Sequence, residues 1–222
     1  MIAWAAVDPG TAELRESEHG DTVFPAASTI KLFVYSAFRR SALDPAEISP
    51  APETGGSGVT EHLRTPLALA DHAFLMLAVS DNASTNVLLQ RLSYDAVAAE
   101  VERLGLERTH VRRAMMSAGD ENLTTATDLA RGLAKLLREP FAPELLAALR
   151  VAADAESFLP HLVDDGTAVA AKSGELESVR HEVAYLEHAD CSLVTAVCSS
   201  PPARPDELAA HAANLWARAR RN

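Results

Sequence analysis

The stretch Ala27-Ser28-Thr29-Ile30-Lys31-Leu32-Phe33 holds a serine and a lysine three positions apart, and an apolar run follows them. The apolar residues continue to Phe38, which is enough for a buried helix. Pro25 and two alanines stand just upstream and suit a tight entry into that helix. We therefore expect Ser28 in the first turn of the helix and Lys31 one turn later on the same face.

A hydroxyl and an amine on one helix face can form a catalytic pair. A partly buried amine loses some of its preference for the charged form. Lys31 can then take the proton of Ser28 Oγ, which is the Ser-Lys form of nucleophile activation. The positive end of the helix also favours negative charge that develops near Ser28. The motif alone is weak, because roughly one match per chain of this length arises at average composition.

Two further motifs strengthen this interpretation. Ser80-Asp81-Asn82 and then Lys172-Ser173-Gly174 follow along the chain. The order Ser-x-x-Lys, Ser-x-Asn, Lys-Ser/Thr-Gly is the signature of class A β-lactamases and penicillin-binding proteins. The sequence therefore resembles the serine penicillin-recognising family, and its class A β-lactamase branch most closely. The resemblance covers nearly the whole chain, is specific at the three motifs and looser between them.

The expected fold class is α/β in the broad sense, more closely α+β. Strand character at both ends with helices between them favours an antiparallel sheet flanked by helices, with an inserted all-helical lobe. We expect one β-lactamase/transpeptidase-like domain over residues 1–222, with a sheet lobe at about 1–40 and 165–222 and a helical lobe at about 41–164. The active site would lie in a cleft between the two lobes.

Apolar periodicity and turn residues place the individual elements. Strands are expected at Ile2–Val7, Thr11–Arg15, Thr167–Ala171, His181–Leu186 and Cys191–Cys198. Helices are expected at Thr65–Val79, Asn82–Leu92, Tyr94–Leu104, Thr124–Leu137, Pro143–Ala153 and Pro205–Arg221.

The resemblance implies roles for the first two motifs. Ser28 would be the nucleophile and Lys31 its base. Ser80 would pass a proton to the leaving nitrogen, and its alternative role is a helix cap. Asn82 would hold the lysine and a substrate amide, and its alternative is an ordinary loop residue.

The third motif would form one wall of the cleft. By resemblance, Lys172 lies at a strand end, keeps the potential positive and attracts a substrate carboxylate; its alternative is an exposed strand lysine. Ser173 would contact the substrate, and Gly174 would let the strand backbone approach a ligand closely. The backbone N–H groups of Ser28 and Glu175 would form the oxyanion hole.

Arg180 or His181 falls about where class A enzymes keep an arginine for the substrate carboxylate. For His181, a purely structural role is the alternative. Glu175 departs from the resemblance, because the family usually has a small neutral residue at that position. A carboxylate beside the oxyanion hole would repel an anionic substrate.

The loop that carries the deacylating glutamate in class A enzymes is shorter in this chain. The corresponding stretch is Val111–Asn122. If Arg113 matches the loop arginine, the glutamate position falls on Met115, which cannot act as a base. Glu107 and Glu121 are the nearest carboxylates, and a solvated surface role is the alternative for both.

Composition excludes several function classes. The net charge of −11 and the lack of a basic patch argue against a nucleic-acid partner. No apolar run reaches membrane-spanning length, and no secretory signal is visible, so we expect a cytoplasmic protein; the alternative is a secreted protein from which a leader was removed. Cys191 and Cys198 share one strand-like run and are expected to be free buried thiols. No histidine spacing suits a metal, and no cofactor is implied.

The favoured function is a β-lactamase-like serine hydrolase that acts through an acyl-enzyme on Ser28. Its substrate would be a small molecule with a β-lactam, amide or ester acyl group. One alternative is an esterase or peptidase without useful β-lactam turnover. Another is a slowly acylating penicillin-binding sensor or scaffold. The sequence predicts no oligomeric state.

Overall fold

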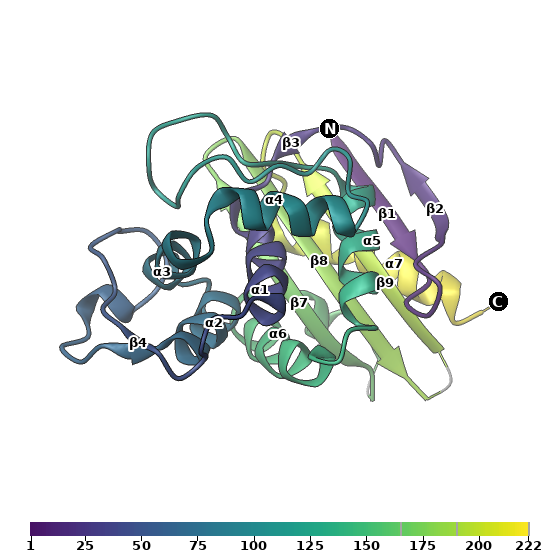
Figure 1. The fold of residues 1–222 in the computed structure, drawn as a ribbon. Helices are drawn as coiled ribbons and strands as arrows, with labels where there is room; N and C mark the ends of the chain where they lie inside the picture. The colour runs from purple at the N-terminus through teal and green to yellow at the C-terminus, as the bar shows by residue number, and fades with distance from the viewer. Residues whose placement is uncertain (165, 190, 222) are drawn as a thin grey trace.

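The two ends of the chain meet in one antiparallel sheet of order β2-β1-β9-β8-β7. The computed structural model describes residues 1–164, 166–189 and 191–221. Figure 1 shows the first strands beside the last ones, and the fold class expected from the sequence is confirmed. The strands of the sheet are β1 (Ile2–Val7), β2 (Leu14–Glu18), β7 (Ala168–Leu176), β8 (Val179–His188) and β9 (Cys191–Ser199).

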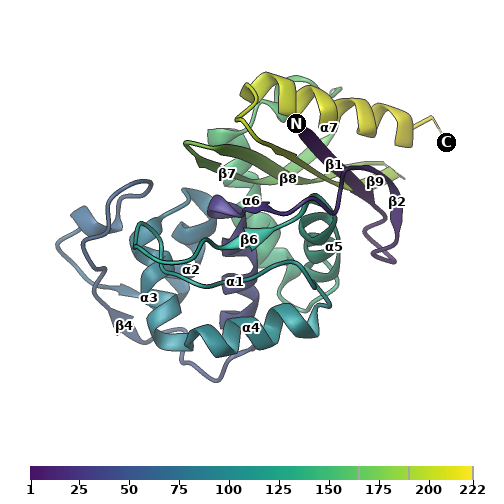
Figure 2. The ribbon, with the colours of Figure 1, turned by 90° about the horizontal axis from the view of Figure 1, so that it is seen from above.

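Helices cover both faces of the sheet. Figure 2 shows α7 on one face and α1, α5 and α6 on the other. The helices are α1 (Lys31–Arg40), α2 (Leu69–Ala78), α3 (Asn82–Leu92), α4 (Tyr94–Arg103), α5 (Ala126–Leu136), α6 (Ala142–Glu156) and α7 (Pro205–Ala219), with short 3-10 turns η1 (Ala27–Ile30), η2 (Thr60–His62) and η3 (Leu159–His161). Two-residue strands pair β3 (Phe24–Pro25) with β6 (Leu123–Thr124), and β4 (Ile48–Ser49) with β5 (Leu67–Ala68).

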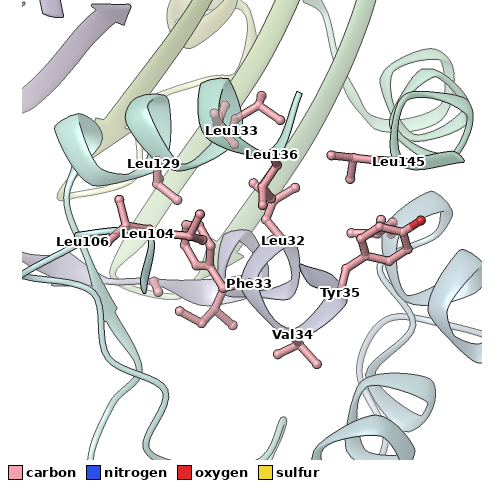
Figure 3. Packing of buried hydrophobic residues seen from close by; sticks show 14 of the residues in the cluster. Leu32, Phe33, Val34, Tyr35, Leu104, Leu106, Leu129, Leu133, Leu136 and Leu145 are labelled. Atoms are coloured by element: carbon pink, nitrogen blue, oxygen red, sulfur yellow. The ribbon is translucent and has the colours of Figure 1, made fainter. Parts of the chain in front are cut away.

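Helix α1 is the centre of the main core. Leu32 and Phe33 are fully buried, and Figure 3 shows them among leucines of α5 and of the segment after α4. Each fully buried side chain of this size contributes about 2 kcal/mol. A Cβ at Gly132 would lie 2.5 Å from the Phe33 ring, so glycine lets α5 pack directly on α1. This packing holds the Ser-Lys stretch against the rest of the molecule.

Caps set the start of two helices that flank the site. The carboxylate of Asp81 accepts the amide of Ser84 at the start of α3. The hydroxyl of Thr125 accepts the amide of Asp128 at the start of α5. Such caps each stabilise a helix by about 1 kcal/mol. The predicted bounds of α3 therefore agree with the structure, and those of α5 differ only at its ends.

Some predicted bounds are wrong because tertiary pairing decided them. The strand expected at Thr11–Arg15 forms three residues later, after the Asp8 carboxylate binds the amides of Gly10 and Thr11 in an extended turn. The helix expected from Thr65 begins only at Leu69, because Leu67–Ala68 pairs with β4.

Two corrections concern the motifs. Strand β7 continues to Leu176, so Lys172 lies inside the strand and not at its end. Ser28 belongs to η1, and Lys31 begins α1, so the two residues flank a junction of helix types.

Both cysteines are free and lie on β9, as expected, but only Cys198 is fully buried, whereas Cys191 is partly exposed. Among the described residues no helix is long and apolar enough to cross a membrane. The division into lobes near residues 40 and 165 stays a prediction, and Asp165 itself lies outside the described residues.

Candidate active site

The amine of Lys31 is the meeting point of the first two motifs. Lys31 is fully buried, and its Nζ lies 3.0 Å from Ser28 Oγ and 3.1 Å from Ser80 Oγ. It also lies 2.8 Å from Asn82 Oδ1 and 2.6 Å from the Ser80 carbonyl. Residues about fifty positions apart in sequence are thus joined at one nitrogen, which suits proton transfer between the two hydroxyls.

Lys31 has more oxygen neighbours than an ammonium has protons. Four oxygens surround Nζ, and an ammonium donates three hydrogen bonds. A neutral amine has a lone pair that can accept a hydroxyl proton instead. Burial, followed by the nearby charge of Lys172, holds the pKa of Lys31 well below its ordinary value. The site therefore lowers the cost of a neutral Lys31.

Asp81 is a residue that the sequence analysis did not assign, and it holds the loop before α3. Its carboxylate accepts the amides of Val59 (2.6 Å) and Thr60 (2.9 Å) and the Thr60 hydroxyl (2.5 Å). These hydrogen bonds outweigh burial and lower the pKa of Asp81. A Cβ on Gly58 would lie 2.3 Å from the same carboxylate, at a φ of +121° that favours glycine. The glycines of this loop are visible in the sequence and could have indicated such a close contact of its backbone.

Ser80 adopts a strained backbone conformation next to this anchor. Its φ is 54°, a region that residues other than glycine enter rarely. Asn82, one residue after Asp81, donates from its backbone N–H to the Ser57 carbonyl at 2.9 Å. The Asn82 side chain donates to the Gly55 carbonyl at 3.1 Å. The loop thus fixes Ser80 and Asn82 around Lys31, and the cap interpretation of Ser80 is wrong, because Asp81 caps α3.

Strand β7 brings the third motif against η1. A Cβ on Gly174 would lie 3.0 Å from the backbone nitrogens of both Ser28 and Thr29, so only a glycine permits this separation without a shift. Lys172 is fully buried, so the alternative of an exposed strand lysine is wrong. Its Nζ lies 3.0 Å from the Ser173 carbonyl and 3.5 Å from the Glu156 carboxylate.

Glu175 and Arg180 face each other across β7 and β8. Arg180 donates from Nε to Glu175 at 3.1 Å, donates from Nη2 to its other oxygen, and donates from Nη1 to the Ala203 carbonyl at 2.6 Å. His181 is buried and donates from Nε2 to the Pro25 carbonyl at 2.8 Å. Burial lowers the pKa of His181, so its ring stays neutral at physiological pH.

Two hollows meet at Ser28. The α7-side hollow measures about 230 Å³ and is lined by Ser80, Glu156, Phe158, Glu182 and Leu208, together with Ser173, Gly174, Arg180 and His181. The Met115-side hollow measures about 260 Å³ and is lined by Asn82, Arg113, Met115, Met116 and Glu121. Ser28, Ser57 and Glu175 border both. The site residues expected from the sequence therefore gather at one place.

The short loop after α4 places Met115 beside this site. Its backbone N–H donates to Asn86 Oδ1 at 2.8 Å, and its carbonyl accepts from Asn86 Nδ2 at 3.2 Å. Glu121 lines the same hollow in an ion pair with Arg113 at 2.7 Å. Glu107 lines a separate hollow beside α4, away from Ser28.

Ser57, Glu156 and Glu182 line the site without having been anticipated. Glu156 ends α6, and Glu182 lies on β8 opposite Ser173. No short motif contains them, so the sequence carried no signal for their position. Among the described residues, no group of three histidine, cysteine, aspartate or glutamate side chains is arranged to hold a metal ion.

The comparisons with known proteins agree with this geometry. The model of the Beta-lactamase enzyme family matches residues 2–219. A β-lactamase from Sphaerobacter thermophilus is 27% identical, with a TM-score of 0.82 over 90% of this chain and 83% of that one. PBP-A is 23% identical, with a TM-score of 0.84 over 96% and 87%. No curated protein matches the sequence closely enough to add to this comparison.

A third similar structure is a point mutant of PBP-A as an acyl-enzyme complex with penicillin G. It is 24% identical, with a TM-score of 0.81 over 96% of this chain and 87% of that one. At this identity the two PBP-A structures support the fold alone. The family match spans nearly the whole chain and includes all three motifs. The chain therefore belongs to the beta-lactamase enzyme family and is a serine hydrolase that resembles class A β-lactamases.

Proposed function

We propose that Ser28 attacks the acyl carbon of a β-lactam or ester and forms an acyl-enzyme, with Lys31 as its base. One observation carries this proposal: the buried Lys31 Nζ lies within hydrogen-bond distance of both the Ser28 and the Ser80 hydroxyl. A single amine can therefore take a proton from one hydroxyl and exchange one with the other. The sensor and scaffold alternatives are not favoured, because the matching family and the similar solved β-lactamase support a hydrolase.

The proton follows a short path in this proposal. Ser28 Oγ bonds to the carbonyl carbon while its proton passes to Lys31 Nζ. When the bond to the leaving atom breaks, Ser80 Oγ gives its proton to that atom and regains one from Lys31. The carbonyl oxygen gains negative charge near the amides of Ser28 and Glu175, with Lys172 supplying positive potential. Asn82 keeps Lys31 in place.

Hydrolysis of a penicillin acyl-enzyme is proposed to be the slow step. A positioned carboxylate base would normally activate the water. If Arg113 matches the loop arginine of class A enzymes, Met115 stands where that carboxylate would be. Glu121 lines the Met115-side hollow, but Arg113 donates hydrogen bonds to both of its carboxylate oxygens. An acyl-enzyme with penicillin G is known for the PBP-A mutant of similar fold. Esters with good leaving groups are expected to turn over faster than penicillins.

Active-site labelling tests the nucleophile. A fluorophosphonate probe and penicillin G should each add mass to the peptide that contains Ser28. The Ser28→Ala variant should lose the label. Ser57→Ala is the matched control, because Ser57 borders both hollows but does not contact Lys31. Persistent labelling of Ser28→Ala, or equal loss in Ser57→Ala, would overturn the assignment.

A cytoplasmic location is also part of the proposal. The two thiols of β9 support it, because a reducing compartment keeps such cysteines free. Cell fractionation of the native host, with detection by an antibody against this chain, tests it. Recovery in an exported fraction would contradict it.

A further inference from the structure

The α7-side hollow is the leaving-group end of the cleft if the proposed function holds. Ser80, the proposed donor to the leaving atom, lines this hollow and does not line the Met115-side hollow. The group released from the acyl carbon must therefore occupy the space bordered by Glu156, Glu182 and Leu208. Its chemistry can be inferred from what these walls offer.

The two cations at this end already face oxygen atoms of the protein. Arg180 directs Nε and Nη2 to Glu175 and Nη1 to the Ala203 carbonyl. Lys172 contacts the Ser173 carbonyl and Glu156. A substrate carboxylate would have to displace one of these acceptors, and an arginine fork bound to a carboxylate is a strong competitor.

The neutral donors at this end are engaged as well. The hydroxyl of Ser173 donates its one proton to Glu156 at 2.5 Å, so a substrate would have to compete with this carboxylate for it. His181 must carry its proton on Nε2, because that nitrogen contacts a carbonyl oxygen, which only accepts. Its Nδ1 is then a bare acceptor, and it is buried without a partner among the described residues. Neither side chain therefore offers an anion a donor without such competition.

Carboxylates outnumber the cations here. Glu156, Glu175 and Glu182 face Lys172 and Arg180. Glu182 is 9% exposed, and its Oε1 has no hydrogen-bond partner among the described residues. Burial raises the pKa of Glu182 to about 7, against the opposing effects of Ser157 and Lys172. Glu182 is then partly ionised at neutral pH, and this partial charge adds to the charges of Glu156 and Glu175, which the two cations already balance. An added carboxylate would meet this surplus of negative charge.

We propose that the α7-side hollow accepts an uncharged leaving group and disfavours one that bears a carboxylate. Neutral esters and amides are then the better substrates, and a penicillin, which carries a carboxylate beside its leaving ring nitrogen, is a poorer one. The inference rests on the proposed acyl-enzyme function and adds the charge of the released group to it.

A matched pair of esters tests the inference. Both carry the same acyl group; one releases 4-nitrophenol and the other releases 3-carboxy-4-nitrophenol. The kcat/KM of each is divided by its rate of hydroxide-catalysed hydrolysis, which corrects for intrinsic reactivity. The corrected value should be at least about tenfold higher for the neutral ester, since placing like charges together is costly. If turnover is too slow, acylation rates from intact mass give the same ratio.

One variant and its control sharpen the test. Glu156→Gln removes the negative charge that faces Lys172 and Ser173. It should raise the corrected kcat/KM of the carboxylated ester, relative to that of the neutral ester, by about tenfold. Glu177→Gln makes the same charge change at an exposed position two residues after Glu175 and should leave the ratio unchanged. The wild-type ratio stands as a test even if Glu156→Gln does not fold.

The outcomes separate the two proposals. A wild-type enzyme that hydrolyses the carboxylated ester as well as the neutral one refutes the inference and leaves the acyl-enzyme proposal intact. An equal change of the ratio in Glu156→Gln and Glu177→Gln refutes the assigned role of Glu156. Absence of acylation by either ester, together with no label on Ser28, refutes the proposed function itself.

Discussion

The α7-side hollow and the Met115-side hollow both reach Ser28, but their walls carry different side chains. The first is lined by hydroxyls, three glutamates and an arginine. The second contains two methionines and an arginine whose carboxylate partner is exposed. In the proposed mechanism, acylation and release of the leaving group use residues of the first hollow, whereas a water that attacks the acyl-enzyme would need a base in the second. In the proposed mechanism the two half-reactions share Ser28 and Glu175 but differ in the other residues, so they can be altered separately.

The largest expected effect comes from removing the group that both hydroxyls share. Lys31→Ala should slow labelling of Ser28 by a fluorophosphonate about 10³-fold, because a positioned base typically contributes 10²–10⁴-fold. The labelling rate measured by intact mass checks this. Lys135→Ala, which changes a lysine on α5 that contacts the Leu104 carbonyl, is the control and should keep the wild-type rate. An unchanged rate in Lys31→Ala would mean that another group takes the proton.

The second prediction changes the other hollow. Met115→Glu places a carboxylate where the deacylating base is absent, and should speed loss of the penicillin acyl-enzyme by about 10²-fold. The decay of the acyl-enzyme by intact mass is the measurement. Met116→Glu adds the same charge at a neighbouring methionine that is 60% exposed, and should change the decay little. Rapid steady-state penicillin turnover without a burst in the wild type would instead indicate Glu121 as a base.

The third prediction concerns the pH dependence of stability. Glu182 has a folded-state pKa of about 7, above the ordinary 4.5, so the folded protein holds this proton more tightly than the unfolded chain. Its stabilising contribution is present below pH 4.5 and is lost as pH rises through 7. Burial raises the pKa of Glu182, Ser157 and Lys172 oppose this effect, and Glu156 acts in turn on the pKa of Lys172. The free energy of unfolding of the wild type should therefore fall between pH 5 and pH 8 by about 2 kcal/mol more than that of Glu182→Gln.

Urea unfolding at pH 5 and pH 8 measures this difference. Glu177→Gln is the exposed control and should keep the wild-type pH dependence. The prediction fails if Glu182→Gln and the wild type lose the same free energy of unfolding over this range.

The smallest expected effect tests the close approach of β7 to η1. Gly174→Ala adds a methyl group 3.0 Å from the backbone nitrogens of Ser28 and Thr29, so one of the two segments must shift. A small displacement of the reacting groups should lower the acylation rate about tenfold, with less effect on the decay of the acyl-enzyme. Stopped-flow acylation and intact-mass decay separate the two steps. A decrease confined to the decay would show that the approach serves the other hollow.

Local patterns determined much of what the sequence revealed. The spacing of Ser28 and Lys31 is a property of one helical turn, and β1 follows directly from its apolar run and the turn after it. The predicted and observed bounds of α3 agree because the residues that start and end this helix lie next to it in the sequence. These features depend on residues a few positions apart, which is the range over which periodicity and capping act.

Only the tertiary structure decided how the motifs meet and what surrounds them. Lys172 is buried inside β7 because the pairing with β8 continues past the motif. The residues after the motif have only a modest strand preference, so the sequence did not predict this continuation. Glu156 reaches Ser173 from the end of a helix that carries no motif. Such contacts join segments that are distant in sequence, and their geometry follows from the packing of whole elements. The sequence alone therefore indicated which residues carry the proposed chemistry, while the packing of whole elements decided which charged side chains surround them.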